Sequence, residues 1–200
     1  MHTLTRHASH ESSAASFGKV FEITPHPSQP NVYHLVMKGF LSPGWSGRLA
    51  AGLAQHRISI IRGEAEKITA SAWHSSFELK ASAFASDPLG IDYVTLAGIE
   101  LPSDRTTERI SLRSFRMEPG SRHEGSLYLE IRGVDRLGFL GDLLDYFSMR
   151  CLFPVKMAIE TVGDTAVDRF WLRSVGGSVP SESIAAAIKE NLERLVIGNA

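Results

Sequence analysis

The chain has 200 residues, of which 43% are hydrophobic and 22% are charged, so it can bury one sizeable core or two smaller ones. A formal net charge of -1 gives no strong attraction to nucleic acid or to an anionic membrane surface. A single cysteine, Cys151, excludes an internal disulfide framework and a zinc site built from cysteines, and fits a reducing compartment.

Residues 1–16 lack the continuous apolar core of a signal peptide and are expected to form a disordered tail. No later segment has the roughly 18 consecutive apolar residues that a membrane-spanning helix needs. We therefore expect a soluble protein of the cytoplasm, without a nucleic-acid or membrane partner.

Residues 17–120 are expected to form a first domain. Its patterns predict a strand over 32–38, a helix over 45–55, strands over 58–70 and 72–84, and a weaker helix within 87–101. The segment 109–118 could supply a closing strand. The order β-α-β-β-α-β gives an antiparallel sheet with both helices on one face, the ferredoxin-like arrangement.

Residues 121–200 are expected to form a second domain with the order strand, helix, strand, strand, helix. Apolar residues alternate with polar ones from Leu127 to Ile131, which is typical of a half-buried strand. Apolar residues with helical spacing follow, namely Leu140, Leu143, Leu144 and Phe147. Two strands on either side of Gly163 form a hairpin. Ser181 is then a candidate N-cap for a last helix that buries Ile184, Ile188, Leu192 and Leu195.

One edge of the second domain is left open by this pattern, because only residues 196–200 follow its last helix. The segment 18–23 reads as a strand and has no place in the first domain. We predict that it pairs with the open edge of the second domain, with Phe17, Val20 and Phe21 partly buried.

The two domains align when the sequence is shifted by 94 positions. This shift places Gly44 on Gly138 and Gly47 on Gly141, and it matches Trp45 with Phe139. A chance match between common residues is the alternative to an internal repeat. A repeat predicts two units that pack as one pseudo-symmetric pair and unfold together, since each small sheet buries little surface alone.

At this point the second domain resembles an ACT domain. The resemblance is carried by "VDRLGFL" at 134–140 and by "IETVGDTAVDRFWL" at 159–172, where Thr161, Gly163, Asp168 and Phe170 have the family's spacing. In the first domain it rests on "SPGW" at 42–45 and on the repeat. Within the family, the pair is most similar to the tandem ACT domains at the C-terminus of bacterial uridylyltransferases that modify the nitrogen regulator PII.

This resemblance implies an α+β fold of two ferredoxin-like ACT-type units. It also implies amino-acid or other small-metabolite binding, side-by-side pairing such as a homodimer, a role in nitrogen regulation, and neither catalysis nor a cofactor. Phe153 and Pro154 stand where the family often has an Asn-Ile pair, which disfavours a conventional amino-acid ligand. The first domain has Leu41 where the second has the acidic turn residue Asp135.

The strand-to-helix turns are the candidate ligand sites, because the first amides of a helix are unpaired and lie at its positive end. An anion could bind these amides while Asp135 receives an amino group. The candidate residues are Asp135, Arg136, Leu137, Gly138, Phe139 and Leu140 in one turn, and Ser42, Pro43, Gly44 and Trp45 in the other. Alternatively, Asp135 caps its own helix and Gly138 only permits close packing. Trp45 is either a lid over a pocket or part of the core.

Other chemistry has weaker support in the sequence. The histidines outside the tail show no metal-ligand spacing, no G-x-S-x-G motif is present, and the aromatic RNA-binding pattern of some ferredoxin-like domains is absent. We therefore expect a non-catalytic regulatory protein that senses a small metabolite and acts as a homodimer or on a partner protein. The alternative is a structural dimerisation or protein-interaction module whose ligand site has decayed.

Overall fold

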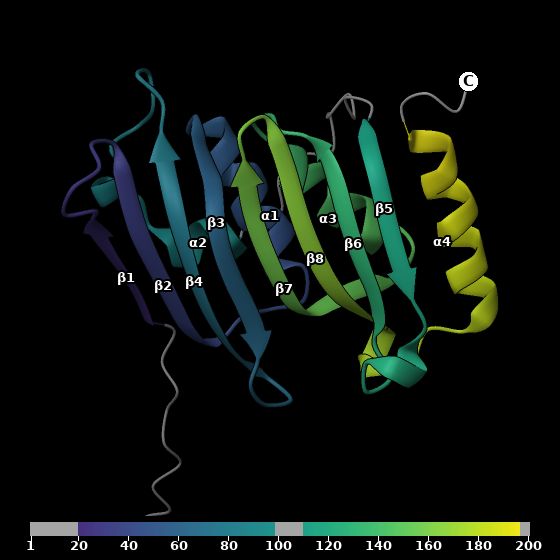
Figure 1. Ribbon diagram of the computed structural model, residues 1–200. Helices are drawn as coiled ribbons and strands as arrows, with labels where there is room; N and C mark the ends of the chain where they lie inside the picture. The colour runs from purple at the N-terminus through teal and green to yellow at the C-terminus, as the bar shows by residue number, and fades with distance from the viewer. Residues whose placement is uncertain (1–19, 99–109, 197–200) are drawn as a thin grey trace, which may run out of the picture.

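A computed structural model describes residues 20–98 and 110–196 of the chain, so the tail predicted at 1–16 lies outside the described residues. Within these ranges, eight strands form one antiparallel sheet in the order β1-β2-β4-β3-β7-β8-β6-β5 (Figure 1). Their bounds are β1 Val20–Pro25, β2 Val32–Phe40, β3 Ile58–Lys67, β4 Ala72–Ala81, β5 Leu112–Glu118, β6 Leu127–Val134, β7 Leu152–Val162 and β8 Thr165–Ser174.

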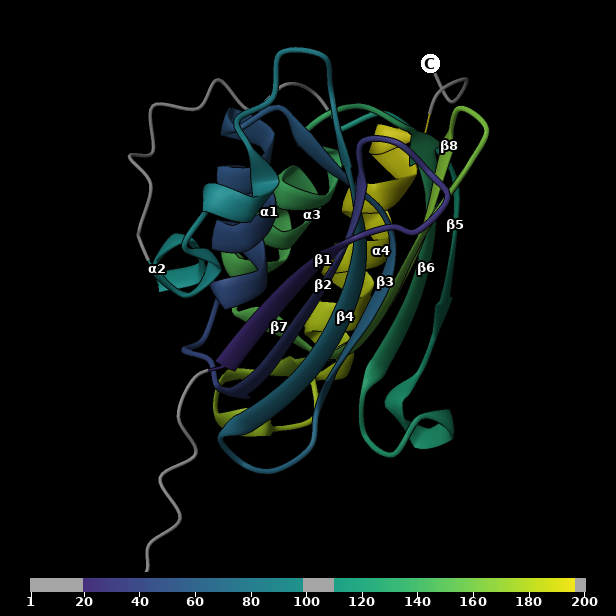
Figure 2. The ribbon, with the colours of Figure 1, turned by 90° about the vertical axis from the view of Figure 1, so that its left-hand side faces the viewer.

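The four α-helices of the described residues lie on the same face of this sheet (Figure 2). Their bounds are α1 Trp45–Gln55, α2 Tyr93–Gly98, α3 Phe139–Ser148 and α4 Glu182–Leu195. Short 3-10 turns are η1 Pro88–Gly90, η2 Gly120–Arg122 and η3 Val175–Gly177. Apolar side chains of the covered sheet face and of the helices form one continuous core. No helix of the described residues is long and apolar enough to cross a membrane.

The chain folds as two ferredoxin-like units that share this sheet, which confirms the predicted α+β class. The first unit consists of β1, β2, α1, β3, β4 and α2, and the second of β5, β6, α3, β7, β8 and α4. Both units have the same strand order when each is read from its outer edge to the junction. The predicted bounds are close to the observed ones, and helix 45–55 is reproduced as Trp45–Gln55.

The strand that closes each unit differs from the predicted one. β1 pairs with β2 of the first unit, so the prediction that segment 18–23 covers the second unit is wrong. β5 pairs with β6, so the prediction that segment 109–118 closes the first unit is also wrong. Each closing strand thus precedes its unit and forms a hairpin with the next strand. Alternation identifies a strand but not its partner, and neighbours in sequence are the more common partners.

The closing strand of the first unit is only partly covered. Phe21 is half-buried and its ring lies 5.5 Å from that of Tyr93 in α2. The predicted contact of Phe17 lies outside the described residues.

The two units meet at β3 and β7 in the sheet and at α1 and α3 in the helix layer. The strand register runs from Arg62↔Glu160 to Glu66↔Lys156. A β-carbon added to Gly141 would lie 3.4 Å from the backbone nitrogen of Ala51, so the two helices approach closely there. Gly47 and Gly141, which the repeat matches, therefore allow the helix of one unit to pack closely against that of the other.

Candidate functional site

The two predicted turns occupy equivalent places in the two units and begin α1 and α3. Gly44 has φ 78 and Gly138 has φ 86, a left-handed conformation that favours glycine. Neither helix is capped by a side chain, so the alternative that Asp135 caps its own helix is wrong. A β-carbon at Gly138 would meet other atoms at ordinary contact distances. The glycine is therefore needed for its left-handed backbone conformation and not for close packing.

Each turn faces the start of a strand that belongs to the other unit. The first turn lies opposite the beginning of β7, and the second lies opposite the beginning of β3. Each also contacts the junction helix of the other unit. The junction therefore creates two hollows that the sequence repeat relates, which we name the first cleft and the second cavity.

The first cleft has a volume of about 630 Å³, within the range of about 300–1,000 Å³ that is common for small-molecule sites. Its walls are mainly apolar and include Phe40, Trp73, Phe153, Pro154 and Val175. Of the residues predicted in the first turn, Pro43, Gly44 and Trp45 line the cleft. Ser42 instead accepts a 2.7 Å hydrogen bond from Arg48, which holds the turn.

Trp45 belongs to the core and also lines the first cleft. It is 2% exposed, and its ring packs edge-on against Trp73 at 5.4 Å. This position supports the core alternative over a mobile lid. Its indole Nε1 is nevertheless buried without a hydrogen-bond partner, although buried tryptophans usually find one. The hydroxyl of Ser174, another residue of the cleft, is also buried without a partner.

Two arginines of the first cleft already donate hydrogen bonds within the protein. Arg48 donates hydrogen bonds to the carbonyls of Ala97 and Pro43. Arg173 donates to the hydroxyl of Ser126 and to the carbonyl of Gly177. Lys67 lines the cleft from an exposed position at the end of β3. The acid Asp145 of α3 also lines the cleft. The cleft thus combines apolar walls with the positive charge of Lys67 at its rim and one acid.

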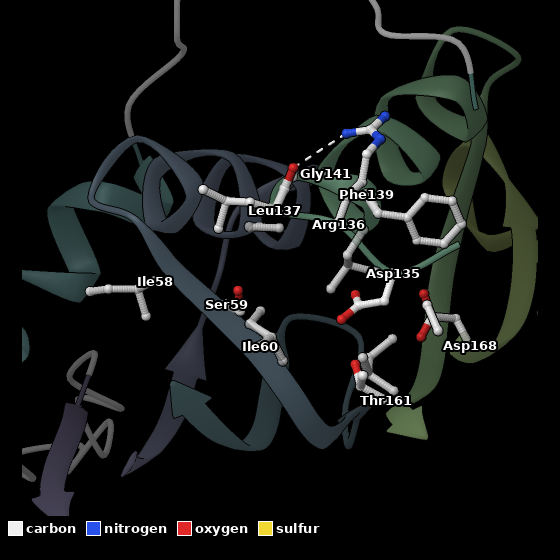
Figure 3. Close-up of a pocket in the computed structure, with 15 residues that line it drawn as sticks. Ile58, Ser59, Ile60, Asp135, Arg136, Leu137, Phe139, Gly141, Thr161 and Asp168 are labelled. Atoms are coloured by element: carbon white, nitrogen blue, oxygen red, sulfur yellow. Dashed lines mark hydrogen bonds between the residues drawn. The ribbon is translucent and has the colours of Figure 1, made fainter. Parts of the chain in front are cut away.

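The second cavity is much smaller, with a volume of about 30 Å³. All six predicted residues of the second turn line it, together with Ile58, Ser59 and Ile60 of β3 and with Thr161 and Asp168 of the β7-β8 hairpin. Arg136 forms an ion pair with Asp142. Its guanidinium group lies away from the carboxyl groups of Asp135 and Asp168 (Figure 3). An amino acid does not fit in this space, because a single water already needs 10–15 Å³ or more.

Asp168 is the most unusual group at the second cavity. The alternation of β8 places its side chain on the helix-covered face, and it is 1% exposed. Its neighbours on β6 and β7 are Ile131 and Ile159. Burial, together with the nearby charge of Asp135, raises the pKa of Asp168 to about 8, against the opposing effects of a backbone hydrogen bond from Glu160 and of the charge of Arg169.

Asp135 lies at the exposed side of the second cavity. Partial burial of its carboxyl raises the pKa, and a hydrogen bond from the backbone of Arg136 opposes that effect. Asp135, Thr161 and Asp168 line the same cavity, and in Figure 3 the carboxyl group of Asp168 is directed toward Asp135, whose charge acts on it. One oxygen of Asp168, Oδ1, is buried without a hydrogen-bond partner.

Sequence reasoning did not assign Asp168, Thr161 or the start of β3 to a site. An acid at an inward position of an alternating strand, in "AVDRFWL", was the signal that could have found Asp168. Among the described residues, no group of three or more His, Cys, Asp or Glu side chains could hold a metal ion.

Comparisons with known proteins do not identify a family for this chain. No family model matches the chain, and no curated protein matches it. Among solved structures, an aspartate kinase from Synechocystis is similar, with a TM-score of 0.42 and 13% sequence identity. The match covers 82% of this chain and 27% of the kinase chain. A likeness of this degree assigns no function, and the similarity to uridylyltransferases of PII remains one of sequence motifs.

Proposed function

We propose that this protein is a non-catalytic regulatory module of tandem ACT-type units that binds a small anionic metabolite in the first cleft. The observation that carries the proposal is the cleft itself, which opens at the junction of the units and contains two buried polar groups without partners. A ligand that accepts a hydrogen bond from Nε1 of Trp45 would remove the cost of burying that group.

The chemistry of the walls narrows the class of ligand. Trp73, Phe153 and Pro154 favour an apolar or aromatic body, and Lys67 favours an anionic group. The amides at the start of α1 add a second attraction for a negative charge. Phe153 and Pro154, the departure from the family's Asn-Ile pair, therefore suit a ligand more apolar than a polar amino acid. An aromatic amino acid or a phenyl-substituted carboxylate meets these requirements.

Under this proposal the ligand controls the activity of a partner protein, and the module itself acts as a homodimer or binds that partner. A cytoplasmic setting belongs to it as well, because the one cysteine, Cys151, is free and exposed. A link to nitrogen regulation would follow from the motif resemblance alone.

Thermal unfolding of the full chain against the twenty amino acids and phenyl-substituted carboxylates tests the proposal. A ligand at 100 times its dissociation constant adds about 2.7 kcal/mol to the free energy of unfolding. Val175→Trp should fill the mouth of the cleft and abolish the shift. Val179→Trp is the matched control, because Val179 is similarly exposed and does not line the cleft.

Two outcomes would oppose the proposal. If no compound raises the unfolding temperature, the alternative of a structural or protein-interaction module is favoured. If Val175→Trp and Val179→Trp respond alike to a compound that does bind, the ligand site is not the first cleft.

A further inference from the structure

The proposed function uses the first cleft and leaves the carboxyl pair of the second cavity without a role. Asp168 lies in the core between Ile131 and Ile159, where an acid without compensation is costly. An apolar residue at this inward position would avoid that cost. The presence of an acid therefore requires an explanation in terms of what it contacts.

The hydrogen bonding of Asp168 is incomplete in a way that points into the cavity. Its Oδ1 has no partner, and its carboxyl group is directed toward Asp135 across the cavity that both residues line (Figure 3). Arg169 does not neutralise the pair, because it follows Asp168 in the strand and its Nε bonds Glu130 at 3.2 Å. Two adjacent acids repel each other when both are ionised, so a guest with positive charge and hydrogen-bond donors complements them.

The size and the lining of the cavity select the kind of cation. A volume of about 30 Å³ holds about two atoms of the size of water, so only the ammonium end of an amine fits inside. Oxygen-bearing side chains are few, since most of the lining is apolar, as with Ile60, Leu137 and Ile159. A hard metal ion such as Ca²⁺ takes six to eight oxygen ligands. An ammonium group needs only three acceptors for its N-H groups and tolerates apolar contacts around its carbon.

We propose that the second cavity binds the primary ammonium group of a small amine, or the ammonium ion itself, through Asp135, Asp168 and Thr161. The two carboxylates and the threonine hydroxyl accept one hydrogen bond each. Any carbon attached to the nitrogen lies against Leu137 and Ile60 at the wall. The site is separate from the first cleft and does not rest on the function proposed for it.

Binding of an ammonium group stabilises the ionised form of Asp168, so it is linked to release of a proton. With the pKa of Asp168 near 8, only a small fraction of this group is ionised at pH 6.5 and most of it at pH 8.5. The affinity for methylammonium should therefore rise at least about fourfold over this range, while the amine stays protonated.

Calorimetric titration of the full chain with methylammonium chloride tests the site, with ammonium and propylammonium chlorides as further arms. A stronger response to ammonium identifies the free ion as the guest, and a stronger response to propylammonium identifies an organic amine. Tetramethylammonium, which has no N-H group, should not bind. Asp168→Asn and Thr161→Val should each lower the affinity by about tenfold or more.

Asp164→Asn is the matched control, because Asp164 belongs to the same hairpin but is exposed and paired with Arg113. Val175→Trp at the first cleft should leave methylammonium binding unchanged, which separates this inference from the function proposed above. The inference is overturned if no amine binds, if Asp168→Asn binds as tightly as the wild type, or if sodium and potassium chlorides bind as well as ammonium.

Discussion

The buried acid Asp168 makes a prediction about stability that needs no ligand. Its pKa is raised in the folded chain, from an ordinary value near 4 to about 8, so the folded state holds one more proton than the unfolded state between these values. The free energy of unfolding must then fall as the pH rises through this window. The stability that the folded chain has from keeping Asp168 protonated is fully present below about pH 4 and is lost above about pH 8.

The size of this effect follows from the proton count. One extra proton in the folded state gives a slope of about 1.4 kcal/mol per pH unit. Between about pH 5.5 and 7.5 the free energy of unfolding should therefore fall by about 2 to 3 kcal/mol because of Asp168. Asp168→Asn cannot titrate, so it should lose this part of the pH dependence.

Urea unfolding at several pH values, in phosphate buffer without primary amines, measures the slope. The comparison between wild type and Asp168→Asn removes the effect of groups that titrate in both, histidines included. In Asp164→Asn the slope should stay that of the wild type, because pairing with Arg113 lowers the pKa of Asp164 and its titration falls below the window. Equal slopes in the wild type and in Asp168→Asn would refute this explanation of the buried acid.

Three further predictions concern packing, capping and the first cleft. Gly141→Leu should cost about 1–3 kcal/mol of stability in urea unfolding by forcing α1 and α3 apart, whereas Gly90→Leu, with open space around its backbone, should cost far less. Ser181→Ala should cost about 0.5–2 kcal/mol, because the serine hydroxyl accepts the N-cap bond of α4, and Ser181→Asp should retain most of that stability. Trp45→Phe should weaken the binding of any ligand found for the first cleft without destabilising the free chain as much as an alanine would. Trp171→Phe, at a tryptophan that packs on Tyr128 and does not line the cleft, should bind as the wild type does in the same titration.

Much of the fold could be predicted from the sequence because its local signals agree with one another. The glycine before Trp45 and the glycine before Phe139 indicated two helix starts, and both lie there. Ser181 was predicted as the N-cap of the last helix, and its Oγ accepts the amide of Ile184 at 3.3 Å.

What the sequence could not supply is the choice of partner for each segment. β1 and β5 have the alternation of strands, but alternation carries no information about which edge receives them. The same limit applies to the sites. Phe153 was identified as a departure from a family pattern, yet its place opposite the first turn depends on the pairing of β3 with β7. Asp168 has the spacing of the family's motif. The cost of burying its carboxyl group, and the missing hydrogen-bond partner of Oδ1, can be recognised only when its neighbours in the sheet are known.

The position of each closing strand has a consequence for synthesis of the chain. Because β1 precedes β2, the first unit has all its strands and both helices once residue 98 has left the ribosome. Its four strands can pair with one another before the second unit has emerged, as N-terminal domains generally do, and only the outer edge of β3 then remains open for β7. Had β1 closed the second unit instead, a strand made first would have waited, unpaired, for the last part of the sheet. The observed order also makes each unit one unbroken stretch of the gene, so a single duplication event suffices to create the pair.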